Sequence, residues 1–172
     1  MCSSDLEVRA ITTVAGNVPL AHTTPNGLRV LDLAERADIP LAAGAERPLV
    51  HLPPRGADDT HGETGLDGSN LPAPSRSPVG GHAVDLLAEQ ALAAPGEVVL
   101  VAVGPLTNVA LLAALRPEAF HALRRIVVMG GAASGGNVSP YAEFNVWFDP
   151  EAAERVRSEE HTSELQSRFG IS

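Results

Sequence analysis

The sequence predicts an α/β fold with a doubly wound, mostly parallel sheet that is incomplete. Residues 98–103 and 126–129 are apolar runs without polar alternation, which is typical of parallel strands buried on both faces. Segments with apolar residues at helical spacing alternate with these runs. The composition is 44% hydrophobic but only 3% aromatic, with 16 Gly and 14 Pro, so we expect an aliphatic core with many tight turns.

The N-terminal segments predict one strand-helix unit followed by a second strand. Residues 8–14 are rich in β-branched side chains and end before Gly16-Asn17, which indicates a strand that runs into a turn. Thr24-Pro25 offers an N-cap and a first-turn proline for the next helix. Residues 41–43 form a short apolar strand candidate.

The C-terminal segments continue the alternation after a long proline-rich loop over residues 50–79. Residues 84–92 and 106–115 predict helices that flank the strand at 98–103, and the strand at 126–129 follows. Asp149-Pro150 predicts the cap of a last helix, whose periodic pattern ends at Val156.

Both ends of the sequence differ from the segment between them. Residues 157–167 resemble the translation of a common sequencing-library adaptor, and residues 1–6 resemble the opposite adaptor. We therefore expect adaptor-derived segments at 1–6 and 157–172 around one domain fragment at 7–156. Two natural polar tails are the alternative.

Charge and cysteine content narrow the classes of partner. The net charge is −9, and the 12 basic residues are all Arg, scattered without a continuous stripe, so we expect no nucleic-acid partner. The one cysteine, Cys2, cannot form an internal disulfide, which favours a reducing, cytoplasmic setting. No apolar run approaches the roughly 20 residues that span a bilayer, so we expect no membrane partner.

Polar side chains gather after the predicted strands, where ligands bind in this sheet type. Asn17 follows the first strand, and Thr107 follows the strand at 98–103. Asn137, Glu143 and Asn145 follow the last strand. Carboxylate and carboxamide groups together match sugar hydroxyls, which both donate and accept.

The residues around Glu143 and Asn145 are apolar and partly aromatic. This alternation predicts that the two polar side chains point together into a pocket above the aromatic rings. The alternative is that the Asn and Gly residues of this region only build turns.

Several motifs carry a family resemblance. They are Ile11-Thr12-Thr13-Val14-Ala15-Gly16-Asn17, His61-Gly62 with Gly65-Leu66, Gly104-Pro105-Leu106-Thr107-Asn108, and the run from Met129-Gly130-Gly131 through Asn137 and Ala142-Glu143-Phe144-Asn145 to Asp149-Pro150-Glu151-Ala152-Ala153. In order and approximate spacing, over residues 8–156, the sequence resembles the inosine-uridine-preferring nucleoside hydrolases.

The resemblance implies a nucleoside hydrolase-like, Rossmann-like sheet and hydrolysis of the N-glycosidic bond of ribonucleosides. It implies that Glu143 and Asn145 are catalytic, and that a backbone carbonyl of Thr107 is one ligand of a Ca²⁺ ion. The whole enzyme would be a dimer or tetramer. The residues implied in nucleoside binding are Asn17, His61, Met129, Asn137, Glu143 and Asn145.

One departure limits these expectations. The family's Asp-rich motif at its first strand is absent from this sequence, and one carbonyl cannot satisfy Ca²⁺, which takes 6–8 oxygens. We therefore expect this chain neither to bind calcium tightly nor to hydrolyse nucleosides, although its full-length parent would do both. We also expect an exposed strand edge and a less stable sheet.

Two other functions compete with the hydrolase. A non-catalytic nucleoside- or sugar-binding module could use the same three side chains at 137, 143 and 145. A dinucleotide-binding oxidoreductase is disfavoured, because no Gly-x-Gly-x-x-Gly follows the first strand. The preference for purine or pyrimidine bases stays open.

Overall fold

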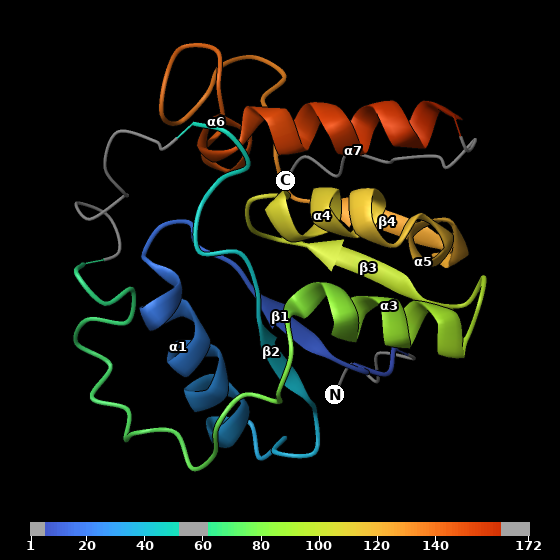
Figure 1. The fold of residues 1–172 in the computed structure, drawn as a ribbon. Helices are drawn as coiled ribbons and strands as arrows, with labels where there is room; N and C mark the ends of the chain where they lie inside the picture. The colour runs from blue at the N-terminus through green and yellow to red at the C-terminus, as the bar shows by residue number, and fades with distance from the viewer. Residues whose placement is uncertain (1–5, 52–61, 163–172) are drawn as a thin grey trace.

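The computed structural model in Figure 1 describes residues 6–51 and 62–162 and contains two pairs of parallel strands. β1 (Ile11–Thr13) pairs with β2 (Leu41–Ala43), and β3 (Val99–Ala102) pairs with β4 (Arg125–Val128). Helices connect the strands within each pair, as parallel pairing requires. Within the described residues the pairs form two separate sheets, which agrees with an incomplete α/β fold.

Six helices surround these strands in the described part of the chain. They are α1 (Leu20–Leu33), α3 (Ala83–Ala93), α4 (Thr107–Leu115), α5 (Pro117–Ala122), α6 (Phe144–Phe148) and α7 (Pro150–Thr162). In Figure 1, α7 lies above α4, and β3 runs between α4 and α3. The main core joins α3, α4, α5 and α7 around Phe120, Leu112 and Ile126. A smaller core joins α1 to β2 through Leu28, Leu31 and Leu41.

The predicted start of α1 at Thr24-Pro25 is wrong. The helix begins at Leu20 after Pro19, and Pro25 lies inside it. Thr24 does not cap the helix, because its buried hydroxyl bonds that of Thr13 in β1 at 2.8 Å. A tertiary contact between helix and strand therefore uses the side chain that the local pattern assigned to capping.

The prediction that β3 and β4 are buried on both faces is also wrong. Leu100 and Ala102 pack against the main core, whereas Val101 and Val103 are 58% and 72% exposed. In β4 only Ile126 is buried. The helices cover one face of this strand pair, and among the described residues the other face stays open, although its side chains are equally apolar.

The second predicted cap, at Asp149, is confirmed. Asp149 is fully buried, and its Oδ1 accepts the N–H of Ala152 at 3.0 Å, which confirms it as the cap of α7. However, α7 continues to Thr162, so the end expected at Val156 is wrong. The sequence patterns missed α5 and α6, which have six and five residues. Residues 62–79 form no helix or strand, as expected.

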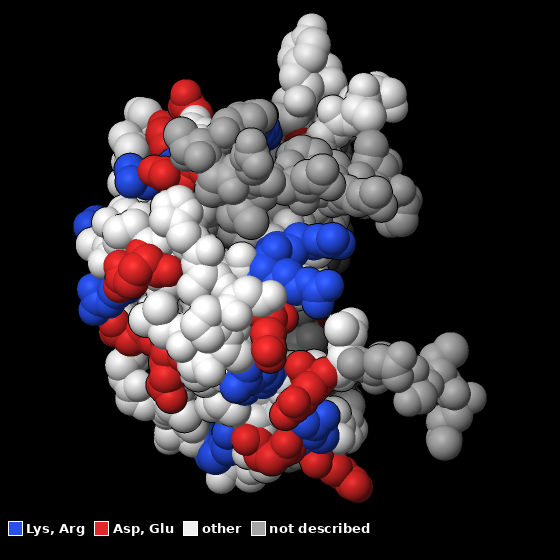
Figure 2. All heavy atoms as spheres, turned by 90° about the vertical axis from the view of Figure 1, so that its right-hand side faces the viewer, with Lys and Arg blue, Asp and Glu red and all other residues white. Residues whose placement is uncertain are grey.

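The distribution of surface charge and the lengths of the helices relate to the nucleic-acid and membrane partners considered above. On the face in Figure 2, acidic and basic side chains are interspersed. No helix in the described ranges is long and apolar enough to cross a bilayer.

Candidate functional site

A pocket of about 270 Å³ lies where the loops after β1 and β3 meet. It is lined by Val14, residues 16–18, Thr23, Asn26, Gly65, Leu66, residues 103–105 and Asn145. The loops meet closely, because a Cβ on Gly16 would lie 3.1 Å from Cδ of Pro105. The pocket therefore sits at the carboxyl ends of strands, where this sheet type binds ligands.

Asn145, the second residue of α6, anchors that helix beside the pocket. The residue is 8% exposed, and its Nδ2 donates to the carbonyls of Val103 at 3.3 Å and Met129 at 3.0 Å. These carbonyls follow β3 and β4, so one amide group fixes α6 against both strand ends. No described group donates to Oδ1 of Asn145, which leaves an acceptor for a ligand hydroxyl.

Glu143 is the N-cap of α6, and this corrects the alternation predicted for this segment. Its carboxylate accepts the N–H groups of Asn145 at 2.9 Å, Gly131 at 3.2 Å and Val146 at 3.3 Å. The side chain is 8% exposed but does not line the pocket. Because the segment is helical rather than extended, Glu143 caps α6 and holds the backbone of Asn145 instead of lining the pocket beside it.

Met129 and Asn137 complete a group around α6 that we call the α6 cap cluster, made of Met129, Asn137, Glu143 and Asn145. Oδ1 of the exposed Asn137 accepts the N–H of Phe144 at 2.9 Å. Met129 is 52% exposed and contributes its carbonyl to Asn145. The fold thus brings together four of the predicted site residues, of which only Asn145 lines the pocket.

Asn17 reaches the same pocket from the loop after β1. It is half-buried, and no described residue hydrogen-bonds its carboxamide. Asn17 and Asn145, which are far apart in the sequence, therefore line one cavity, and each has a polar atom without a hydrogen-bond partner among the described residues.

Thr107 and Asn108 lie beneath the site. The Thr107 hydroxyl donates to Oδ2 of Asp149 at 2.6 Å, both residues are buried, and Thr107 does not line the pocket. The Asn108 carboxamide bonds the N–H of Ala45 and the carbonyl of Thr13, each at 2.9 Å. The metal role of the Thr107 carbonyl stays a prediction. His61, the predicted residue of the closing loop, lies outside the described residues.

Sequence reasoning missed Thr23 and Asn26 as pocket residues. Both belong to α1, and they lie three positions apart, which puts them on one helix face. Because the predicted helix began at Thr24-Pro25, the two residues were not predicted to share one helix face. A helix that began after Pro19 would have revealed it.

The described residues do not fit a calcium site. The pocket lining contains no carboxylate, and the described residues contain no group of three His, Cys, Asp or Glu that could hold a metal ion. Ca²⁺ requires several oxygen ligands with carboxylates among them.

Comparison with known proteins identifies the family. The chain is 50% identical over 156 residues to the pyrimidine-specific ribonucleoside hydrolase RihA of Salmonella arizonae, which covers 91% of this chain and 50% of that protein. The chain spans about half the length of the curated relatives it matches.

Two solved structures have the same fold over this region. A plant nucleoside hydrolase superposes with a TM-score of 0.85 at 37% identity, covering 94% of this chain and 50% of that one. A purine-preferring ribonucleoside hydrolase from Gardnerella vaginalis superposes with a TM-score of 0.87 at 27% identity, covering 96% and 52%. The family model of the inosine-uridine preferring nucleoside hydrolases matches residues 1–166, and the chain belongs to that family.

Proposed function

We propose that the whole protein hydrolyses the N-glycosidic bond of ribonucleosides, and that the pocket between Asn17 and Asn145 holds the ribose. The observation that carries this proposal is one cavity at the strand ends, lined by the Asn17 carboxamide and by Asn145, whose Oδ1 accepts no hydrogen bond from the described residues. The α6 cap cluster supports it, because its hydrogen bonds fix Asn145 before any ligand arrives.

The reaction breaks the bond between C1′ of ribose and a base nitrogen. Water supplies a hydroxyl to C1′, and the base leaves with a proton. Positive charge builds on the ribose ring as the bond breaks, so groups that hold the flattened sugar accelerate the step.

The side chains of this chain divide that work. Oδ1 of Asn145 and the Asn17 amide bind ribose hydroxyls. Asn137 and Met129, which do not line the pocket, are sugar contacts only by the family resemblance. The Glu143 carboxylate holds Asn145 in place by accepting the backbone N–H of Asn145. The buried negative charge of Glu143 favours the cationic sugar. A carboxylate has about four acceptor positions, and three N–H groups occupy Glu143, so about one remains for a sugar hydroxyl.

Calcium dependence belongs to the whole protein in this proposal. A bound divalent cation would lower the pKa of a water molecule and so supply the nucleophile. The described residues do not fit such an ion, so its carboxylate ligands must come from elsewhere, with the Thr107 carbonyl as the one ligand that the family resemblance assigns. Calorimetric titration of this chain should detect no tight Ca²⁺ binding, and tight binding would refute this division.

We base the proposed substrate class on the names of the relatives and on their sequence identity to this chain. The identity is 50% to a protein named for pyrimidine ribonucleosides, 38% to one named for inosine and guanosine, and 27% to one named for purines. We therefore propose a preference for uridine and cytidine, in pyrimidine salvage or catabolism. We further propose a dimer or tetramer in a cytoplasmic setting.

Ribose release from uridine, cytidine, inosine and adenosine tests the activity. The whole protein should release reducing sugar. Asn145→Ala should lower kcat/KM by roughly a hundredfold, because it removes a sugar hydrogen bond and leaves the Val103 and Met129 carbonyls without their donor, at about 1–3 kcal/mol for each group left unpaired. Glu89→Ala, an exposed change on α3, is the control and should keep full activity. Nucleoside binding without any release would instead identify a non-catalytic binding module.

A further inference from the structure

Asn26 of α1 lines the pocket and also holds another part of its wall. Its Nδ2 donates to the carbonyl of Thr64 at 2.7 Å. Gly65 and Leu66, which follow Thr64 directly, line the same pocket. Asn26 therefore connects a helix of the fold to a loop that shapes the cavity.

The loop over residues 62–68 has an internal structure of its own. The Asp67 carboxylate accepts the N–H groups of Glu63 at 2.9 Å and Thr64 at 3.1 Å, together with the Thr64 hydroxyl. Gly65 has a φ of +80°, and a Cβ there would lie 3.0 Å from a methyl group of Val18. The turn is thus formed locally and packs closely on the pocket loop after β1.

A single hydrogen bond attaches this turn to the rest of the described chain. The other hydrogen bonds of residues 62–68 run within the turn or to Ser69. The bond from Asn26 to Thr64 is therefore the one hydrogen bond that joins the turn to the remaining described residues.

The orientation of the Asn26 amide is fixed by its two partners. Nη1 of Arg29, one turn later on α1, donates to Oδ1 of Asn26 at 3.0 Å. A guanidinium can only donate and a backbone carbonyl can only accept, so the amide oxygen must face Arg29 and the nitrogen must face Thr64. An aspartate at this position would keep the partner Arg29 and the size of the side chain, but it would put an acceptor against the Thr64 carbonyl.

We infer that Asn26 is a positioning residue that sets the Gly65-Leu66 wall of the pocket and so determines affinity for the nucleoside. This inference rests on the function proposed for the pocket. The wall contacts the ligand in the ground state and the transition state alike, because it carries no group that reacts. Loss of such uniform binding raises KM and leaves kcat nearly unchanged.

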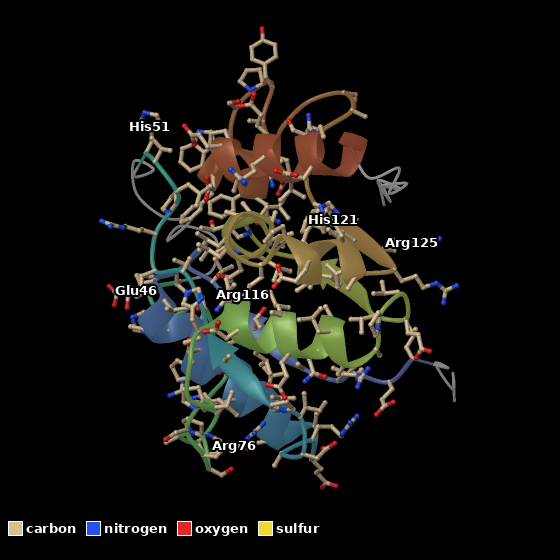
Figure 3. The ribbon with its side chains drawn as sticks, turned by 45° about the vertical axis from the view of Figure 1, so that its right-hand side comes forward. Glu46, His51, Arg76, Arg116, His121 and Arg125 are labelled. Atoms are coloured by element: carbon tan, nitrogen blue, oxygen red, sulfur yellow. The ribbon has the colours of Figure 1, made fainter. Side chains whose placement is uncertain are left out.

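The same helix offers a matched control. Oδ2 of Asp32 accepts the N–H of Ser75 at 2.7 Å and Oδ1 accepts its hydroxyl at 2.8 Å, so Asp32 also ties the long loop to α1. Neither residue lines the pocket. Figure 3 places Arg76, the neighbour of Ser75, at the opposite end of the molecule from α6. Asp32→Ala thus loosens the same loop away from the site.

The first measurement needs no catalysis. Hydrogen exchange of this chain should become faster over residues 62–68 in Asn26→Asp, and it should keep the unaltered rate there in Asp32→Ala. Unchanged exchange over residues 62–68 in Asn26→Asp would overturn the positioning role, whatever the activity of the whole protein. An inactive whole protein would sink the proposed function and leave this result standing.

The second measurement is steady-state kinetics of the whole protein with its best ribonucleoside. Asn26→Asp should raise KM roughly tenfold with kcat within about twofold, since one hydrogen bond and its donor are lost. Asp32→Ala should keep both constants. A fall in kcat at unchanged KM, or equal effects of the two substitutions, would refute the link between this wall and affinity.

Discussion

The Asn108 carboxamide joins the ends of β1 and β2 to α4, and we predict that its removal couples strongly to a change at Gly44. Asn108 is 5% exposed, and it bonds the carbonyl of Thr13 and the N–H of Ala45, each at 2.9 Å. Asn108→Ala removes the partner of the N–H of the buried Ala45 and of the carbonyl of the half-buried Thr13. At about 1–3 kcal/mol for each group, the substitution should lower the free energy of unfolding by about 2–6 kcal/mol.

Gly44 shows why the two positions depend on each other. A Cβ at Gly44 would overlap the Asn108 carboxamide, and Gly44 does not have a positive φ, so the obstacle to alanine is steric alone. Gly44→Ala should therefore cost about 1–3 kcal/mol through overpacking. In the Asn108→Ala background the added methyl group enters vacated space, and its cost should fall below about 0.5 kcal/mol. The expected coupling energy is about 1–3 kcal/mol.

Urea unfolding of the two single variants and the double variant, followed by circular dichroism, measures this coupling. The slope with urea should stay constant, which shows that stability alone has changed. Glu89→Ala, on the exposed face of α3, should shift the free energy by no more than about 0.5 kcal/mol. An equal cost of Gly44→Ala in both backgrounds would refute the contact, and so would a cost below about 1 kcal/mol for Asn108→Ala.

Three further substitutions test other contacts. Thr107→Val removes the 2.6 Å bond to Asp149 within a fully buried pair and should cost about 1–3 kcal/mol in urea unfolding; no change would mean that the hydroxyl is dispensable. Glu143→Gln replaces one acceptor oxygen with an NH₂ group that faces backbone N–H donors. It should lower the urea midpoint of this chain and the kcat of the whole protein. Wild-type values of both would exclude the capping role. The Thr64 hydroxyl, followed by the N–H groups of Glu63 and Thr64, lowers the pKa of Asp67 below its ordinary 3.8. Because the pKa of Asp67 is lower in the folded state, the ionised carboxylate stabilises the fold above pH 3.8, and this contribution is lost as the pH falls through the folded-state pKa. Asp67→Asn should therefore lower Tm near neutral pH and match the wild type in strong acid.

The sequence predicted those parts of the fold that depend on local chemistry. The strand at 41–43, the helix over 84–92 and the Asp149 cap each follow from a short pattern that holds wherever the segment lies. The failures depend on distant partners. The Thr24 hydroxyl bonds Thr13, and the open face of β3 depends on which elements lie over it. No local pattern in the sequence contains that information.

The candidate site divides in the same way. Asn17 and Asn145 were predicted from their positions after strands, and both line the pocket. Asn26 has the same chemistry but lies in a helix, where polar residues are usually solvated, and only the tertiary fold shows that it faces the pocket and the Thr64 carbonyl. Glu143 was predicted both from its position after the last strand and from the family resemblance, yet the expected alternation with apolar neighbours gave it the wrong geometry.

The corrected position of Glu143 makes the proposed sugar site more rigid than the predicted one. An extended segment would leave the side chains at 143 and 145 free to rotate. In the structure, Asn137 and Glu143 occupy the first N–H groups of α6, and the amide of Asn145 is held by carbonyls that follow two strands. A side chain fixed in this way loses little entropy when a hydroxyl binds, so more of the hydrogen-bond energy remains for the transition state. Glu143 therefore contributes most by capping α6, which positions the backbone of Asn145.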